Sequence, residues 1–377
     1  MTTLCSHRAI GLIVNPIAGM GGRVGLKGTD GAATLAEAFR RGAQPASNGR
    51  VLKALQRLVP HAGSTIIFTG SGALGAETAA AAGFDTRVVH IAAAGQTSAH
   101  DTRTATRAIL HAGVDLLLFA GGDGTARDIL DVVGEAVPII GIPAGVKMVS
   151  AVFGTTPENA GMLAGRFLAS DAAIRLREAE VMDIDEDAMR GDRVSTRLYG
   201  YARSPYLRAY SQNAKSGSTL SEDAALDAVC REIANEMEPG RLYILGPGST
   251  TRRVMTALGL PATLLGIDAV LDGQVVGADL AETDLLRLMH GRSTTLIVGV
   301  LGGHGSLFGR GNQQISSAVL RQISRERIVV VAALDKLLAL SPRHLSIDTG
   351  SDDVNATLTG YLPVRIAPDR SIVFQVR

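Results

Sequence analysis

Short apolar runs alternate with helix-like segments over the first 170 residues, and this alternation limits the fold of the chain more than any other feature. Each run is rich in Val, Ile or Leu and ends at residues that favour turns. The predicted strands are 10–14, 66–69, 87–91, 116–120 and 139–142, and the predicted helices are 51–58, 73–82, 99–111 and 125–133. Strand and helix in this order are typical of βαβ units, which predicts a parallel sheet covered by helices.

The composition agrees with buried parallel strands. Of 377 residues, 46% are hydrophobic but only 4% aromatic, so Ala, Val, Leu and Ile must build the cores. A chain of this length has room for two domains. We predict an α/β protein with an N-terminal parallel-sheet domain over 1–170 and a second domain of mixed α/β texture over 171–345. We expect the closing strands in 346–377 to return to the first domain.

Charge and cysteine content exclude several classes of protein. A net charge of +1 gives no general attraction for nucleic acid or for an acidic membrane surface. Cys5 and Cys230 are too far apart to suggest a disulfide framework or a metal site. The chain begins without the apolar stretch of a signal peptide and contains no apolar run of membrane-spanning length. We expect a soluble cytoplasmic protein that binds small molecules, as a monomer or a homo-oligomer.

A carboxylate lies among glycines in Gly121-Gly122-Asp123-Gly124-Thr125, between the predicted strand 116–120 and the predicted helix 125–133. Glycines allow a tight turn and a close approach of a ligand to the backbone. The free amides at the start of a helix bind phosphate well. Asp123 in such a loop can accept a proton from a hydroxyl beside that phosphate. The alternative is an ordinary strand-to-helix turn in which Asp123 caps the helix.

Two further loops follow strands of the same predicted sheet. The first, 15–31, contains Asn15, Gly19 and Lys27, and the second, 141–147, ends at Lys147. Ligands of parallel sheets bind at the carboxyl ends of the strands, where these loops and Gly121 meet. Both lysines are therefore candidates for phosphate contact as point charges. The alternative for the first loop is a surface loop without a ligand.

A similar signal lies in the second domain, where a loop joins the predicted strand 242–245 to the predicted helix 250–258. Arg252 and Arg253 follow in the first helical turn, an unfavourable place for cations unless an anion is near. We therefore predict a possible second anion site that uses Gly246, Gly248, Ser249 and Thr250.

These motifs resemble a known family. Asn15-Pro16-Ile17-Ala18-Gly19 together with the Gly121 to Thr125 loop resembles the ATP-NAD kinase superfamily, which includes diacylglycerol kinases, sphingosine kinases and phosphofructokinases. Over nearly the whole chain, the sequence is similar to the acetoin-catabolism X (AcoX) branch. The segments that carry this second likeness are 21–31, 141–147, 245–250 and 309–314.

The resemblance implies a kinase with an N-terminal NAD kinase-like domain. ATP would be the donor, Mg²⁺ would arrive with the nucleotide, and no separate metal site is assigned. NAD would be the acceptor and NADP the product. Asp123 would act as general base toward the 2′-hydroxyl of the adenosine ribose. The residues implied at the nucleotide phosphates are Asn15, Gly19, Gly121, Gly122, Gly124 and Thr125.

The chain departs from typical NAD kinases in two ways. Typical NAD kinases have an Asn-Glu or Asn-Asp pair that holds NAD at the start of the next domain. This chain has no such pair at the expected place, and the segment 198–205 stands near there instead. Their second domain is mostly β, whereas residues 222–340 read as α/β. Two alternatives therefore stay open. One is a non-catalytic nucleotide- or phosphate-binding accessory protein of an acetoin-type catabolic operon, and the other is a kinase of another small hydroxylated acceptor.

Overall fold

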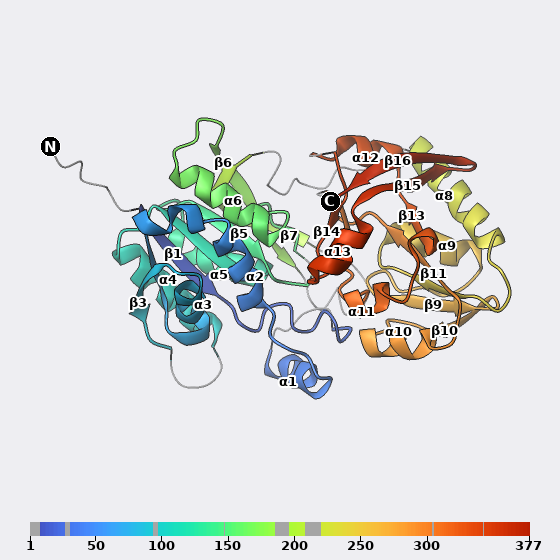
Figure 1. Ribbon diagram of the computed structural model, residues 1–377, viewed down its shortest axis with the longest axis horizontal. Helices are drawn as coiled ribbons and strands as arrows, with labels where there is room; N and C mark the ends of the chain where they lie inside the picture. The colour runs from blue at the N-terminus through green and yellow to red at the C-terminus, as the bar shows by residue number, and fades with distance from the viewer. Residues whose placement is uncertain are drawn as a thin grey trace.

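A computed structural model describes residues 8–26, 31–92, 97–146, 148–184, 196–207, 220–303, 305–341 and 343–377. The chain forms two lobes that lie side by side (Figure 1). The N-terminal lobe is coloured blue to green and the C-terminal lobe yellow to red. Within the described ranges, no helix is long and apolar enough to cross a membrane.

The N-terminal lobe is built on a five-stranded sheet with the order β3-β2-β1-β4-β5. Its strands are β1 (Arg8–Val14), β2 (Thr65–Gly70), β3 (Asp85–His90), β4 (Leu116–Gly121) and β5 (Ile139–Pro143). Every neighbouring pair is parallel. Every residue of β4 is buried, as expected for a central strand covered on both faces. The predicted parallel sheet is confirmed.

Helices cover both faces of this sheet. One face packs against α2 (Ser47–Gln56), α3 (Ala76–Ala81) and α6 (Pro157–Leu168). The other packs against α4 (Ala99–His111) and α5 (Asp123–Val133). Two short 3₁₀ helices, η1 (Val59–Ser64) and η2 (Gly72–Leu74), flank β2. The remaining helix, α1 (Ala32–Arg40), packs on the loop after β1 and lies below the lobe in Figure 1.

An antiparallel hairpin completes the N-terminal lobe. It consists of β6 (Arg175–Ile184) and β7 (Thr196–Tyr206). Ala179, Val181 and Ala202 are buried in the same core as Phe119 of β4 and Ile129 of α5. Strands β6 and β7, which the sequence led us to place in the second domain, therefore pack on the first sheet.

The C-terminal lobe contains a seven-stranded mixed sheet with the order β10-β9-β8-β11-β13-β15-β16. Its strands are β8 (Leu242–Leu245), β9 (Asp268–Leu271), β10 (Gln274–Gly277), β11 (Thr294–Gly299), β13 (Ile328–Val331), β15 (Gly360–Ala367) and β16 (Arg370–Val376). Strands β8, β11, β13 and β15 are parallel, and the outer strands pair antiparallel. The predicted α/β texture of this half is confirmed.

Helices again lie on both faces of the sheet. On one face are α8 (Leu220–Asn235) and α9 (Ser249–Ala257). The other face carries α10 (Glu282–Met289), α11 (Ser317–Leu320), α12 (Leu334–Ala339) and α13 (Asp352–Leu358). The small parallel pair β12 (Ser306–Phe308) and β14 (Ser346–Ile347) joins that second layer, and η3 (Arg325–Arg327) precedes β13.

The closing strands do not return to the first sheet, which corrects our expectation for 346–377. Strand β15 pairs with β13, and β16 completes the edge of the C-terminal sheet. Val364 and Val376 are fully buried in the core of that lobe. The β5 edge of the first sheet is already paired, because the Gly141 amide donates to the Val152 carbonyl and the Gly154 amide to the Gly141 carbonyl, both at 2.9 Å.

Candidate active site

The glycine-rich loop lies at the carboxyl end of β4, where Gly121 ends the strand and Asp123 begins α5. A Cβ atom on Gly121 would lie 2.4 Å from Cβ of Thr125, and one on Gly145 would lie 2.9 Å from Cα of Gly122. Both distances are far below ordinary contact. Gly121 therefore leaves room for the Thr125 side chain, and Gly122 and Gly145 let two neighbouring loops pack backbone against backbone.

Asp123 is buried, with 6% of its surface exposed, and its carboxylate is held by the segment after β5. Oδ2 accepts a hydrogen bond of 2.9 Å from the Val149 amide, and Oδ1 accepts one of 2.9 Å from the Ser150 amide. The Ser150 hydroxyl also donates to Oδ1. That hydroxyl accepts a bond of 2.9 Å from the Met182 amide of β6. The acid is thus tied to the 148–150 segment and, through it, to the hairpin.

Opposing effects act on the charge of this carboxylate. Burial raises the pKa of Asp123, while the hydrogen bonds from Ser150 and Val149 and the positive charge of Arg310 lower it. Arg310 comes from the C-terminal lobe and is itself buried, which lowers its pKa to about 10. Our sequence reasoning gave Arg310 no role, although it lies in the motif 309–314 that carried the likeness to the AcoX branch.

The structure brings most of the predicted phosphate-binding residues together. The Asn15 side-chain amide donates to the Thr125 hydroxyl at 3.1 Å, which joins the loops after β1 and β4. Gly19 has a positive φ of 74°, and a Cβ atom there would lie 1.9 Å from the Ala144 carbonyl oxygen. Gly124 lies in the first turn of α5. Three loops thus meet at one edge of the sheet, as the topology requires.

The two predicted lysines, Lys27 and Lys147, lie outside the described residues. Their contact with phosphate stays a prediction.

The second predicted anion site, the loop between β8 and α9, is held by hydrogen bonds from the Thr251 side chain. The Thr251 hydroxyl donates to the carbonyls of Gly246, at 2.6 Å, and Gly248, at 3.0 Å, and so braces the loop. Ser249 is exposed at the start of α9, and Thr250 follows it. Arg253, one of the cations that suggested an anion here, forms ion pairs with two acids of α8, at 223 and 227. An anion at this loop stays a prediction.

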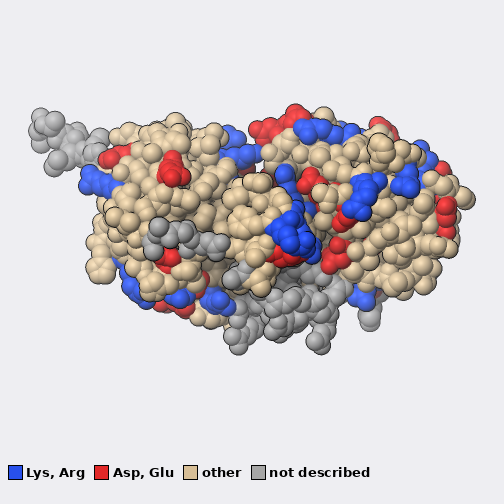
Figure 2. Space-filling view, turned by 90° about the horizontal axis from the view of Figure 1, so that it is seen from below, with Lys and Arg blue, Asp and Glu red and all other residues tan. Residues whose placement is uncertain are grey.

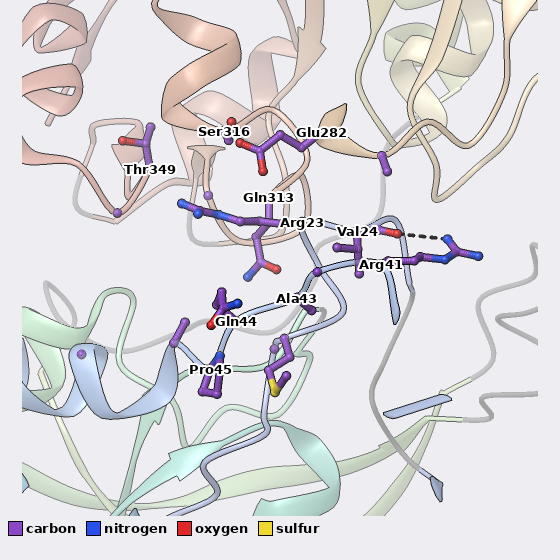
Figure 3. A pocket seen from close by; sticks show the side chains of 18 of the residues that line it. Arg23, Val24, Arg41, Ala43, Gln44, Pro45, Glu282, Gln313, Ser316 and Thr349 are labelled. Atoms are coloured by element: carbon purple, nitrogen blue, oxygen red, sulfur yellow. Dashed lines mark hydrogen bonds between the residues drawn. The ribbon is translucent and has the colours of Figure 1, made fainter. Parts of the chain in front are cut away.

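A cavity of about 850 Å³ lies between the lobes (Figure 3). The N-terminal lobe contributes residues 19, 20, 23, 24, 40–46, 49, 50, 53 and 144, and the C-terminal lobe contributes 281–284, 309, 313, 315, 316 and 348–350. Viewed from below, Lys and Arg side chains gather where the two lobes meet (Figure 2). Gly19 lines this cavity, whereas Asp123 is not part of its lining.

Charged side chains of both signs face this cavity. Arg50 pairs with Asp348 across the lobes at 2.6 Å, and Arg41 donates to the Val24 carbonyl at 3.1 Å. Arg23 lies between the lobes in Figure 3, and the described residues give it no ion-pair partner. Glu282 faces the cavity from the opposite lobe, also without an ion pair among the described residues. Among the described residues that line the cavity, Arg23 and Glu282 are therefore the charged side chains without an ion pair.

A second, much smaller cavity shares part of its lining with the first and is also lined by Arg310. It measures about 10 Å³ and shares Arg50, Gln313 and Asp348 with the large cavity, while Met148 and Arg310 line its far side. The Gln313 Oε1 atom is buried and has no hydrogen-bond partner in the structure described. Asp123 lines neither of these two cavities.

The segment 198–205, which stands near the expected place of the Asn-Glu pair, lies away from the cavity between the lobes. In β7, the Tyr199 hydroxyl donates to Asp131 of α5 at 2.6 Å, and the Arg127 guanidinium lies 5.9 Å from the centre of the Tyr199 ring. This segment packs along α5 and does not line the cavity between the lobes. Any acceptor in that cavity must be recognised by other residues.

Acidic side chains do not gather into a metal site in the described part of the chain, where no group of three or more His, Cys, Asp or Glu could hold an ion.

Comparison with known proteins agrees with this architecture. Residues 10–172 match the family model of the ATP-NAD kinase N-terminal domain, and residues 239–375 match that of the ATP-NAD kinase C-terminal domain. A search of curated proteins found no match. The two matches together cover most of both lobes, and they contain the Gly121 to Thr125 loop and Arg310. The chain therefore belongs to the ATP-NAD kinase superfamily and has the paired domains of a kinase-type phosphotransferase.

Proposed function

We propose that this protein transfers the γ-phosphoryl group of ATP to the 2′-hydroxyl of NAD and so forms NADP in the cytoplasm. The observation that carries the proposal is the position of Asp123, a buried carboxylate in the glycine loop between β4 and α5 of an NAD kinase N-terminal domain. Phosphoryl transfer needs positioning, neutralisation of phosphate charge and one proton acceptor from the protein. The narrower likeness to the AcoX branch is part of the same proposal.

In this proposal Asp123 accepts the proton of the attacking hydroxyl. The amides of Gly122 and Gly124, at the N-terminus of α5, bind phosphate oxygens. Asn15 fixes the Thr125 hydroxyl beside them. Mg²⁺, carried in on the nucleotide, would neutralise phosphate charge. Since the 148–150 segment covers Asp123, this segment must move when substrates bind.

We propose that the acceptor lies in the 850 Å³ cavity, whose size suits a nucleotide. Arg23 would bind its phosphate, because a guanidinium matches phosphate geometry. Glu282 would accept hydrogen bonds from ribose hydroxyls, as acidic residues do in other dinucleotide sites. These two residues would take over the role of the missing Asn-Glu pair.

The deciding experiment incubates the pure protein with ATP, Mg²⁺ and NAD and measures NADP by an enzymatic assay. We expect Asp123→Asn to lower the rate by about 10² to 10⁴-fold, the usual contribution of a general base. Asp115→Asn is the matched control, because Asp115 also accepts a backbone hydrogen bond, from the Ala9 amide at 2.9 Å, but lies before β4. No NADP from the wild type, with no NAD binding by calorimetry, would refute the proposal.

A kinase of another small hydroxylated acceptor is the second candidate, favoured because Tyr199 and its neighbours pack along α5. ATP consumption that depends on a hydroxylated metabolite and not on NAD would support it. The occupied oxygens of Asp123 favour the third candidate, a non-catalytic binding protein. In that case ATP or NAD would bind without turnover, and Asp123→Asn would bind equally well.

A further inference from the structure

A turn in the C-terminal lobe is built to project one arginine into the N-terminal lobe. Gly309 and Gly311, on either side of Arg310, have φ values of 108° and 90°, which favour glycine. A Cβ atom on Gly309 would lie 2.2 Å from the Asp348 carbonyl oxygen. Asn312, buried, clamps the turn: its Oδ1 accepts from the Gly309 amide at 2.9 Å, and its amide group donates to the carbonyl at 307, also at 2.9 Å.

Arg310 reaches the segment that holds Asp123. Its Nη2 donates to the Met148 carbonyl, and the next two amides in the chain are the donors to the Asp123 carboxylate. The guanidinium carbon lies 5.9 Å from the centre of the Phe153 ring. Arg310 is 8% exposed and Asp123 is 6% exposed. A buried cation and a buried anion from different lobes therefore lie at one centre, where each compensates the desolvation of the other.

We propose that Arg310 is a positioning residue for Asp123, which orients the 148–150 segment and supplies positive charge that favours the ionised form of the buried carboxylate. The base is then competent only while the lobes are docked. The catalytic part of this inference rests on the kinase reaction proposed above, whereas the charge pair can be tested without any substrate. The positive charge of Arg310 lowers the pKa of Asp123. The positive charge of Arg50 lowers the pKa of Arg310 in turn, and Arg50 itself is paired with Asp348.

A purely structural contact between the lobes would need only the hydrogen bond to Met148. The two roles separate when the charge is removed, because only the charge role changes the ionisation of Asp123. Arg310→Met removes the charge and keeps most of the side-chain length. Arg310→Lys keeps the charge and loses the planar donor group.

The test measures the unfolding free energy of wild type, Arg310→Met and Arg310→Lys from about pH 4 to pH 9, each with and without Asp123→Asn. The difference within each pair reports the titration of Asp123 in the folded protein. We expect its midpoint to rise by about one pH unit or more in Arg310→Met, a tenfold change in the ionisation constant. In Arg310→Lys it should stay near the wild-type value. Equal midpoints in wild type and Arg310→Met would overturn the proposal.

A second outcome covers the case in which Arg310→Met folds poorly. Adding Asp123→Asn should then restore stability, because it removes the carboxylate that lost its partner. A double variant no more stable than Arg310→Met alone would overturn the proposal. Arg321→Met is the control for loss of an arginine, since Arg321 pairs with Asp353 at 2.7 Å within the C-terminal lobe. It should leave the Asp123 midpoint unchanged.

Failure of this inference and failure of the proposed function give different results. If the midpoint shifts but NADP is never formed, the charge pair stands and the NAD kinase reaction falls. If NADP is formed with equal midpoints, the reaction stands and the role of Arg310 falls. If both hold, the activity of Arg310→Met should return toward the wild-type level as pH rises through the shifted midpoint, and activity lost equally at every pH would contradict the catalytic part.

Discussion

Asp123 is the residue whose pKa is most directly set by opposing effects of burial, hydrogen bonding and nearby charge. Burial is the largest of these effects and raises the pKa of Asp123. The folded protein therefore holds a proton on this group at pH values where the unfolded chain has lost it. The Ser150 hydroxyl and two backbone amides limit this rise by stabilising the charged form.

The sign of the resulting pH dependence follows. The pKa of Asp123 is raised in the folded protein. Its contribution to stability is therefore fully present below the pKa of Asp in the unfolded chain, about 3.9, and is lost as pH rises through the pKa of the folded state. We expect wild type to lose stability relative to Asp123→Asn as pH rises from about 4. Urea unfolding of both proteins over a pH series measures this. A wild type that gains stability relative to the variant over that range would contradict the raised pKa.

Gly19 supports a second prediction for a single residue. Gly19→Ala places a Cβ atom 1.9 Å from the Ala144 carbonyl oxygen at a φ of 74°. Gly42 is the matched control, because its φ is 80° but nothing lies within 4 Å of a Cβ atom there. We expect Gly42→Ala to cost about 1 kcal/mol from backbone strain and Gly19→Ala about 2 kcal/mol more from the clash. Equal losses in urea unfolding would show that the loop after β1 adapts freely.

Individual helices and strands could be predicted well where the pattern is local. Helix 99–111 was expected with the bounds it has, and Ser98 caps it in a capping box with Asp101. The Asp272-Gly273 pair between β9 and β10 is another local signal, and its φ values of 51° and 71° fit the tight hairpin turn that this dipeptide favours. The helix α1 was not expected, because it follows a glycine-rich stretch that reads as loop.

The capping box of α4 gives a prediction for a whole element. Ser98→Ala removes the oxygen that accepts from the Asp101 amide at 3.4 Å. We expect a loss of about 1 kcal/mol in unfolding free energy, the usual cost of a lost N-cap. Thr104→Ala, at a half-buried position in the middle of the same helix, is the control and should change stability little or raise it slightly. A similar loss in both variants would contradict a specific capping role.

Contacts across the whole molecule were beyond the sequence patterns. The hydrogen bond from Arg310 to the Met148 carbonyl and the effect of Arg310 on the charge of Asp123 join residues in different lobes, and no spacing rule relates them. The ion pair of Arg50 with Asp348 and the bond of 3.1 Å from the Glu282 amide to the Arg23 carbonyl are of the same kind. The glycine loops could be found because each is local, whereas the residues that face them depend on how the lobes dock.

These contacts predict how the lobes respond to change. Arg50→Met removes the half-buried pair with Asp348 and the bond of 3.1 Å to the Pro143 carbonyl. We expect a larger radius of gyration by solution scattering in the variant. Arg321→Met, which breaks a pair inside one lobe, is the control and should leave the radius unchanged. Equal radii in the Arg50 variant and wild type would show that this pair does not hold the lobes together.

Ligands should act in the opposite direction. We expect ATP and NAD together to compact the wild-type protein in solution scattering, because residues of both lobes line the cavity between them. No compaction under saturating conditions would count against closure of the lobes over the substrates.

The turn that carries Arg310 also has a consequence for biosynthesis. The N-terminal lobe, hairpin included, leaves the ribosome long before residue 310 is made, and domains generally fold in that order. During that interval the nascent lobe holds Asp123 without the positive charge of Arg310, which is one of the effects that lower the pKa of Asp123 in the complete protein. If Asp123 is the proposed base, a growing chain would gain the charge that favours the active form of this base only after most of the chain has been translated.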